Sequence, residues 1–134
     1  MLALRARSFG LIRLAQRIHI VDDDQAIRES LQLFLETHGF VVDTFGSGAE
    51  LFRDGLIRHC DCFILDVNLP GDNGFSLLEK LRRDGINTPA IFMSGRATPA
   101  MHKQAGAAKA AAFFEKPVPP RELLSAIAIA TARQ

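Results

Sequence analysis

Short apolar runs alternate along the chain with longer stretches in which apolar residues recur at helical spacing. Short runs bounded by polar residues or glycine predict strands, and the longer period predicts amphipathic helices. Five strands are expected, at about 18–21, 40–44, 62–65, 90–93 and 112–114. Five helices are expected to follow them, beginning near residues 25, 47, 74, 98 and 119. This strict alternation favours βαβ units and therefore a parallel sheet.

The polarity of each run indicates where its strand lies in the sheet. All runs except the second are apolar throughout, which is typical of strands covered by helices on both faces. The second run contains Asp43 and Thr44 and is more polar, so we place its strand at an edge. The predicted fold class is therefore α/β, with a doubly wound five-stranded parallel sheet.

Four of the predicted strands are followed by side chains that can carry chemistry. Asp22 and Asp23 follow the first strand, Asp66 the third, Ser94 the fourth and Lys116 the fifth. The carboxyl ends of parallel strands share one edge of a sheet, which is where open α/β sheets bind ligands. We therefore expect three carboxylates, one hydroxyl and one ammonium group to lie close together.

Such a cluster indicates a particular kind of chemistry. Carboxylates held close together repel one another and are costly unless a cation joins them. Mg²⁺ is the simplest candidate, because it takes oxygen ligands and is commonly completed by phosphate oxygens. Asp66 is then a candidate nucleophile that forms an acyl phosphate. The lysine would attract the phosphoryl oxygens and the serine would donate a hydrogen bond to one of them, so the cluster predicts phosphoryl chemistry.

Length and composition add few constraints. The 134 residues fit one domain, and a formal net charge of +1 predicts neither nucleic acid nor a membrane surface as a partner. No apolar stretch approaches the length of a transmembrane helix. Cys60 and Cys62 are expected to face the same side of a strand, where they are awkward to bridge, so we interpret both as reduced thiols of a cytoplasmic protein.

Residues 1–17 stand apart as a basic extension of the domain predicted over 18–134. The extension contains four arginines but no continuous apolar core, so a cleaved signal peptide is not expected. Two interpretations stay open. The segment is either a frayed extension or misplaced start, or a helix that contacts a partner or a second copy of the chain.

Four motifs lie at the carboxyl ends of predicted strands. They are Ile-Val-Asp-Asp-Asp at 20–24, Leu-Asp-Val-Asn-Leu-Pro-Gly-Asp-Asn-Gly at 65–74, Ser-Gly at 94–95 and Phe-Phe-Glu-Lys-Pro at 113–117. Together they resemble the motifs of the receiver domains of two-component response regulators, over residues 18 to about 130, and the occurrence of all four, in order and at suitable spacing, makes the resemblance specific. The resemblance implies a flavodoxin-like (βα)5 fold, like that of the chemotaxis regulator, with strand order 2-1-3-4-5.

The resemblance also implies a role for each residue of the cluster. Asp66 would be the phosphoacceptor. Asp22 and Asp23 would hold Mg²⁺, or Mn²⁺ as a substitute, together with Asp66 and the backbone carbonyl of Asn68. Lys116 would pair with the phosphoryl group or with Asp66.

Other positions would respond to the phosphoryl group or set how long it persists on Asp66. Ser94 would bind a phosphoryl oxygen, and the ring of Phe113 would turn inward as Ser94 moves. Asn68 and Arg96 occupy the positions at which the family tunes the lifetime of the phosphoryl group. The peptide bond before Pro117 is typically cis in this family.

The family resemblance further implies partners. A sensor histidine kinase would supply the phosphoryl group in a phosphorelay. Phosphorylation would change the surface formed by the helix from 98, the strand at 112–114 and the helix from 119, which would also serve a homodimer. The domain would promote its own phosphorylation and dephosphorylation without being a turnover enzyme. Direct binding of nucleic acid or membrane is not implied.

The chain departs from the family pattern at two positions. Many relatives have a glycine flanked by alanines shortly before the fifth strand, and Lys109 stands at the equivalent place here. Phe113 lacks the hydroxyl of a tyrosine, so a switch at this position must work by packing alone.

Two other functions would use parts of the same pattern. Small Mg²⁺-dependent phosphatases also have an aspartyl nucleophile, but they generally carry a second aspartate two residues later, where this chain has Asn68. A receiver-like module that binds its partner constitutively would not need the complete set of charged residues. Asp24 is most simply the N-cap of the first helix rather than a metal ligand.

Overall fold

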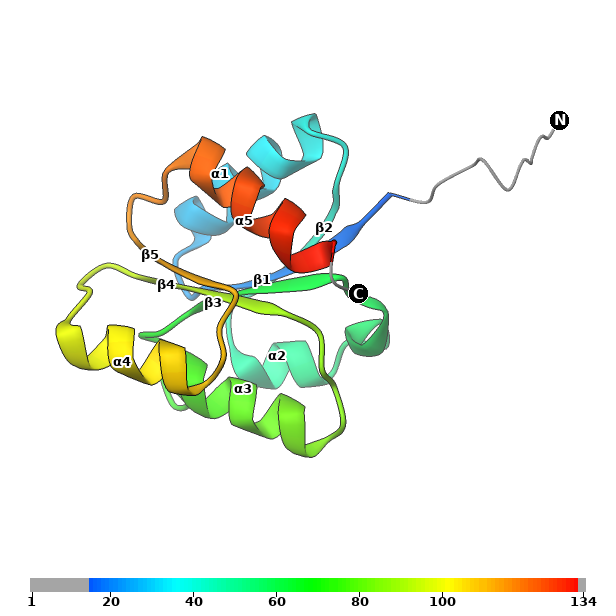
Figure 1. Cartoon of the computed structure of the whole chain (residues 1–134). Helices are drawn as coiled ribbons and strands as arrows, with labels where there is room; N and C mark the ends of the chain where they lie inside the picture. The colour runs from blue at the N-terminus through cyan, green and yellow to red at the C-terminus, as the bar shows by residue number, and fades with distance from the viewer. Residues whose placement is uncertain (1–14, 133–134) are drawn as a thin grey trace, which may run out of the picture.

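Five parallel strands lie in the order β2-β1-β3-β4-β5 in the computed structural model, which describes residues 15–132 (Figure 1). The order and direction of the strands confirm the predicted fold class. Most of the predicted basic extension, residues 1–14, lies outside the described residues. The elements in chain order are β1 (Arg17–Val21), α1 (Gln25–Thr37), β2 (Val41–Phe45), α2 (Gly48–Phe52), a 3-10 helix (Ile57–His59), β3 (Cys62–Asp66), α3 (Gly74–Arg83), β4 (Ala90–Ser94), α4 (Pro99–Ala107), β5 (Ala112–Glu115) and α5 (Pro120–Thr131).

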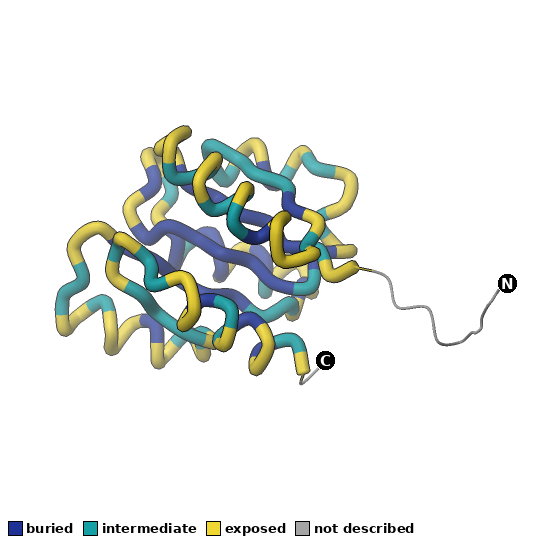
Figure 2. Tube along the Cα trace, turned by 90° about the horizontal axis from the view of Figure 1, so that it is seen from above, coloured by how far each residue is buried: buried dark blue, intermediate teal, exposed yellow. Residues whose placement is uncertain are grey.

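The helices form a layer on each side of the sheet. α1 and α5 cover one face, and α2, α3 and α4 cover the other (Figure 1). All residues of β3 and β4 are buried, which accounts for their unbroken apolar runs (Figure 2). β2 is an edge strand as predicted. β5 is the other edge and is only half-buried, although its apolar run predicted full cover, because it pairs with β4 alone. Within residues 15–132, no helix has the length and apolar character needed to cross a membrane.

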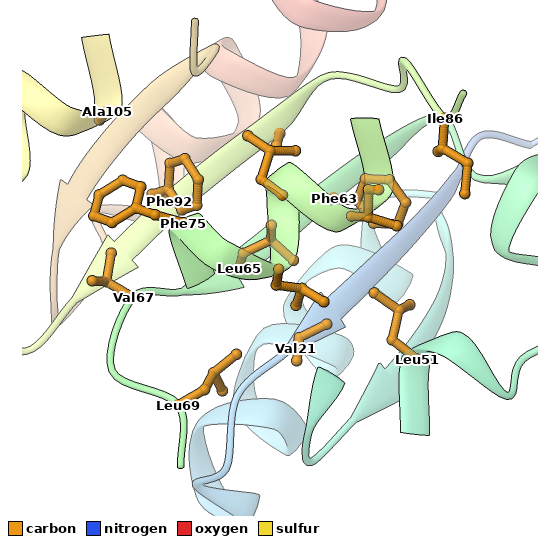
Figure 3. Close-up of a cluster of buried hydrophobic side chains, with 14 of the residues drawn as sticks. Val21, Leu51, Phe63, Leu65, Val67, Leu69, Phe75, Ile86, Phe92 and Ala105 are labelled. Carbon is orange, nitrogen blue, oxygen red and sulfur yellow. The ribbon is translucent and has the colours of Figure 1, made fainter. Parts of the chain in front are cut away.

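Each face of the sheet has its own hydrophobic core. Under α2, α3 and α4, Phe75 packs onto Phe92 of β4 with ring centroids 4.5 Å apart (Figure 3). Under α1 and α5, Ile20 and Ile64 of the central strands pack with Ile127. Full burial of one such side chain stabilises a fold by about 1.5–3 kcal/mol. The two cores therefore hold the central strands, and with them the polar residues at their carboxyl ends, in a defined register.

The two cysteines lie in different cores. Cys60 precedes β3 and belongs to the core under α2–α4, whereas Cys62 begins β3 and belongs to the core under α1 and α5. The expectation that they face the same side was wrong, because Cys60, although its backbone is extended, lies before β3, and the alternation of side chains holds only within a strand. Both are free thiols. Burial raises the pKa of Cys60 to about 12 and also raises the pKa of Cys62, so both are unreactive.

α1, α3 and α4 end in the same C-terminal motif, in which the residue after the helix cap has a positive φ. After α4 this residue is a lysine instead of a glycine. After α1 and α3 the motif places Gly39 and Gly85 at positive φ, 90° and 80°. After α4 the same position is held by Lys109 at φ 58°. The N–H groups of Lys109 and Ala110 each donate to a carbonyl of the last helical turn at 3.0 Å. Lys109 thus occupies a backbone conformation that favours glycine.

Replacement of Lys109 by glycine is expected to stabilise the domain by about 0.5–1 kcal/mol, because a side chain in the left-handed region is strained and glycine is not. Urea denaturation followed by circular dichroism would measure the gain. Lys103→Gly is the matched control, since it removes the same charge from the interior of α4 and is expected to cost about 1 kcal/mol. A loss of stability in Lys109→Gly would contradict the strain at this position.

A histidine is buried between two carboxylates beneath the edge of the sheet. His19 of β1 has no exposed surface. Its Nε2 atom lies 3.1 Å from Asp43 Oδ2 and 3.6 Å from Asp54 Oδ2, and its ring packs edge-on against Phe45 and Phe63. Burial lowers the pKa of His19 below its ordinary value of 6.5, although both carboxylates act in the opposite direction. The folded domain therefore holds His19 neutral at pH 7.

The depressed pKa of His19 predicts a loss of stability in acid. Below pH 6.5 the unfolded chain takes up a proton at this histidine while the folded chain does not, so the free energy of unfolding falls. The slope from this one group is at most roughly 1.4 kcal/mol per pH unit below about pH 6.5. Urea denaturation at several pH values should show a shallower slope for His19→Gln than for wild type. His38→Gln, which changes an exposed histidine, should keep the wild-type slope.

Candidate functional site

Three carboxylates meet at the carboxyl edge of the sheet. Asp22 and Asp23 follow β1, and Asp66 is the last residue of β3. Each offers a carboxylate oxygen, and these oxygens all lie within 4.8 Å of one another. Asp22 and Asp66 are buried at 0% and 2% exposure, whereas Asp23 is exposed. The cluster is therefore anchored in the protein and open to solvent on one side.

Lys116 supplies the cation of the site. Its Nζ atom lies 3.0 Å from Asp66 Oδ2 and 2.8 Å from Asp22 Oδ2, immediately after β5. Burial lowers the pKa of Lys116, but the two carboxylates more than offset this and raise it overall, so the side chain stays charged. Burial raises the pKa of Asp22, with the charge of Asp66 adding to the effect and Lys116 opposing it. The Lys116–Pro117 peptide bond is cis.

The backbone around the carboxylates fixes their orientation. Asp22 Oδ1 accepts the N–H of Asp24 at 2.9 Å, and Asp66 Oδ1 accepts the N–H of Asn68 at 3.0 Å. The Asp24 side chain accepts the N–H groups of Ala26 and Ile27, which makes it the N-cap of α1 as interpreted from the sequence. Each remaining carboxylate oxygen is thus directed toward the cluster or toward Lys116.

Gly74 allows the loop after β3 to fold back onto the site. Its N–H donates to Val67 O at 3.0 Å, which brings the start of α3 against the end of β3. A Cβ atom at Gly74 would lie 2.4 Å from the carbonyl oxygen of Asp66 and 3.1 Å from the Cα atom of Val67. A contact of 2.4 Å is shorter than Cβ atoms make in proteins, so this position accommodates only glycine without a backbone shift.

Ser94, the last residue of β4, is the hub of a polar network beside the carboxylates. It is fully buried. Its Oγ atom accepts the side-chain N–H of Asn68 at 3.0 Å and the backbone N–H of Arg96 at 3.1 Å. Its third contact is to Met101 Sδ of α4, at 3.6 Å. The structure therefore brings Asn68 to Ser94 through its side chain but Arg96 only through its backbone.

Phe113 lies on β5, at the side of the sheet covered by α4. It is half-buried and packs against the core under α2–α4. The ring of His102, an exposed residue of α4, lies against it with centroids 4.6 Å apart. Phe113 is thus enclosed between the core and one surface histidine.

The residues at the sheet edge fit a divalent cation of the magnesium type. The donors are hard carboxylate oxygens from Asp22, Asp23 and Asp66, and no sulfur or imidazole is among them. Mg²⁺ prefers such oxygens and retains several water ligands, for which the exposed side at Asp23 leaves room. A cation there would also offset the repulsion among the carboxylates that Lys116 alone balances only in part.

The sequence model that describes the response regulator receiver domain matches residues 18–128, which include every residue of this site. The chain belongs to the response-regulator receiver family. Receiver domains of this family generally bind Mg²⁺ and work with sensor kinases, and they are not enzymes in the usual sense. The family that the motifs predicted is confirmed.

Two curated relatives of this receiver domain are named as transcriptional regulatory proteins. The C4-dicarboxylate transport transcriptional regulatory protein DctR of Rhodobacter capsulatus is 37% identical over 102 residues, which cover 75% of this chain and 52% of DctR. The transcriptional regulatory protein FixJ of Azorhizobium caulinodans is 34% identical over 110 residues, which cover 82% of this chain and 52% of FixJ. This chain therefore spans about half the length of the curated relatives it matches.

Solved structures share the fold of this receiver domain. The CheY-like response regulator receiver domain protein from Methanospirillum hungatei has a TM-score of 0.78 and 30% sequence identity, and the match covers 89% of this chain and 95% of that one. Response regulator StyR has a TM-score of 0.78 and 31% identity, covering 88% of this chain and 60% of StyR. Both confirm the flavodoxin-like arrangement.

Two contacts of the receiver domain were not found by sequence reasoning. Met101 contacts Ser94, and His102 contacts Phe113. The one sequence signal for Met101 is its spacing of four from Ala105, which places both on the same face of α4. The spacing predicts a face turned to the core, but it cannot identify a hydrogen bond to sulfur.

Proposed function

We propose that this receiver domain is phosphorylated on Asp66 by a sensor histidine kinase and that the phosphoryl group switches the surface of α4, β5 and α5. The observation that carries the proposal is the position of Lys116, which reaches both Asp66 and Asp22 within 3.0 Å beside a third carboxylate. A surface ion pair would not require two buried acids to share one partly buried cation. The arrangement suits an incoming phosphoryl group, because Lys116 can attract the phosphoryl oxygens while Asp66 reacts with the phosphorus.

The metal-binding residues in this proposal are Asp22, Asp23 and Asp66, with the backbone carbonyl of Asn68 as a further ligand. Mg²⁺ is the cation proposed, and Mn²⁺ could substitute for it because it also accepts oxygen ligands. When bound, the cation offsets the repulsion between the Asp66 carboxylate and the phosphoryl oxygens. The short carboxylate distances and the oxygen-only donor set support this assignment.

Asp66 is the nucleophile in the proposed transfer. One of its carboxylate oxygens forms a bond to the phosphorus of the kinase phosphohistidine, and the bond from phosphorus to the imidazole nitrogen breaks, leaving its electron pair on that nitrogen. Lys116 lies on the Oδ2 side of Asp66, where its charge would stabilise the phosphoryl oxygens. Hydrolysis of the acyl phosphate by water returns the domain to its starting state, so no external substrate is turned over.

The switch would begin at Ser94. The phosphoryl group adds a charge of roughly −1.5 to −2 and three strong acceptor oxygens. Ser94 would move to donate to one of them, and Phe113 would follow by packing into the space released. Asn68 and Arg96 lie next to Ser94, a position that supports their proposed role in setting the lifetime of the phosphoryl group.

The output surface is proposed to serve a homodimer through α4, β5 and α5. Ile129 of α5 is a large apolar side chain that is 58% exposed. It lies beside a shallow depression that includes Ala112 and Ala126. We place the domain in the cytoplasm with its kinase, and we propose no direct contact of this domain with nucleic acid or membrane.

The phosphatase alternative is less well supported. It needs a general acid two residues after the nucleophile, and Asn68 cannot donate a proton in that way. Its amide instead donates a hydrogen bond to Ser94. A constitutive binding module would not require the complete arrangement of Asp22, Asp66 and Lys116.

Incubation with acetyl phosphate and Mg²⁺ is expected to add the mass of one phosphoryl group to the domain, measured by intact mass spectrometry. Chelation of divalent cations by EDTA is expected to reduce the gain to background, because three carboxylates and a phosphoryl group then repel one another without a metal. Excess Mg²⁺ added back should restore it. An equal mass gain with and without EDTA would show that phosphorylation needs no divalent cation and would contradict the proposed metal site.

A further inference from the structure

The hydroxyl of Ser94 has a single proton to donate, and in this structure that proton points to a methionine. The Oγ atom already accepts two N–H groups, from the side chain of Asn68 and the backbone of Arg96. Both of these partners can only donate, so the O–H group is left for the remaining neighbour, Met101 Sδ at 3.6 Å. Thioether sulfur is a weak acceptor. Ser94 therefore cannot donate to a phosphoryl oxygen without giving up Met101.

The next residue of α4 holds the other switch position in the same way. The ring of His102 lies 4.6 Å from the ring of Phe113, at an interplanar angle of 49°. The core under α2–α4 supports Phe113 on its inner side, and His102 covers it from the solvent side. Phe113 cannot turn inward without leaving His102. Consecutive residues of one helix thus contact the two side chains that are proposed to move.

Apart from these contacts, α4 buries little side-chain surface against the domain. Of its residues Pro99–Ala107, Ala105 is the one that is buried, and its side chain is small (Figure 3). Met101 also lines an open cavity of about 540 Å³, together with Asn68 and Gln104, between α4 and the loop after β3. Met101 packs against the core under α2–α4 and also borders this cavity, so open space adjoins it on one side. Met101 and His102 thus connect this end of α4 to β4 and β5.

We propose that Met101 and His102 form a latch that holds Ser94 and Phe113 in their unphosphorylated positions, and that phosphorylation frees the N-terminal half of α4 by breaking both contacts. The latch rests on the proposed function at Asp66. Both are positioning residues, since neither lies among the carboxylates and Lys116. In wild type, part of the binding free energy of a phosphoryl group is used to break the contacts of Met101 and His102. Thermodynamic linkage therefore requires that a variant without these contacts bind the phosphoryl group more tightly.

Beryllofluoride, which stands in for the phosphoryl group on Asp66, measures this effect as an equilibrium affinity in the presence of Mg²⁺. Met101→Leu keeps the volume of the side chain but has no acceptor for the Ser94 proton. Isothermal titration calorimetry is expected to give a dissociation constant lower than that of wild type by roughly threefold to tenfold, the equivalent of one modest hydrogen bond. Met93→Leu is the matched control, since Met93 adjoins Ser94 in sequence but lies in the core under α1 and α5, and its affinity should equal that of wild type.

Variants of His102 provide a second, independent test by the same titration. His102→Ala removes the ring that covers Phe113 and should also tighten beryllofluoride binding, whereas His102→Phe restores a ring and should return the affinity toward that of wild type. General destabilisation would weaken binding rather than tighten it. Unchanged or weaker affinity in both Met101→Leu and His102→Ala would overturn the latch alone. Failure of wild type to bind beryllofluoride in an Asp66-dependent manner would overturn the proposed function and the latch together.

Discussion

Replacement of Asp66 by asparagine is expected to abolish phosphorylation by acetyl phosphate in the presence of Mg²⁺. The amide has nearly the shape of the carboxylate, so the N–H of Asn68 still finds an acceptor at this position. The amide oxygen carries no full charge and is a poor nucleophile, so the acyl phosphate does not form. Intact mass spectrometry should show the gain of one phosphoryl group in wild type and none in Asp66→Asn.

The control for this experiment is a second aspartate on the same loop. Asp72 follows β3 by six positions, and its carboxylate contacts Lys80 at the surface, away from the cluster. Asp72→Asn makes the same chemical change and should be labelled like wild type. Equal labelling of wild type and Asp66→Asn would assign the phosphoryl group to another residue, which peptide mapping would then locate.

Replacement of Gly74 by alanine is expected to be among the most damaging single changes in the domain. The added methyl group would lie 2.4 Å from the carbonyl oxygen of Asp66, and all of the nearest atoms belong to the backbone. No side chain can move aside, so the start of α3 and the end of β3 must separate. We expect a loss of about 3 kcal/mol, at the upper end of the usual range for overpacking, together with slower labelling of Asp66.

Thermal or urea denaturation would measure the cost at Gly74, with a second helical glycine as the control. A Cβ atom at Gly106 of α4 meets nothing within 4 Å. Gly106→Ala should therefore stabilise the domain by about 0.5–1 kcal/mol, because alanine favours helix more than glycine does. If Gly74→Ala were as stable as wild type, the close approach of the two backbones would be disproved.

The general architecture of this domain was predictable because it depends on short-range patterns. The apolar runs of β3 and β4 and the helical spacing after each strand define the βαβ units, and the N-cap Asp24 lies where the sequence placed it. The convergence of Asp22, Asp66 and Lys116 followed from the parallel direction of the strands. The unusual position of Lys109 also had a sequence signal, since the expected glycine is missing there.

Contacts between side chains of separate elements were not predictable in this way. His19 lies between Asp43 and Asp54 because β1 pairs with β2 and the chain after α2 returns beneath them. The half-burial of β5 and the placement of Cys60 in the opposite core from Cys62 likewise depend on position in the assembled sheet.

The sequence by itself determined the strands, the helices and the identity of the charged groups at one edge of the sheet, because hydrophobic period, capping and strand direction act over a few residues. The tertiary structure alone decided which atoms meet. The direction of the Ser94 proton depends on where α4 lies against β4, and the cover over Phe113 depends on where it lies against β5. Such contacts differ by a few ångströms between alternative packings of the same helix, and no local pattern encodes that difference.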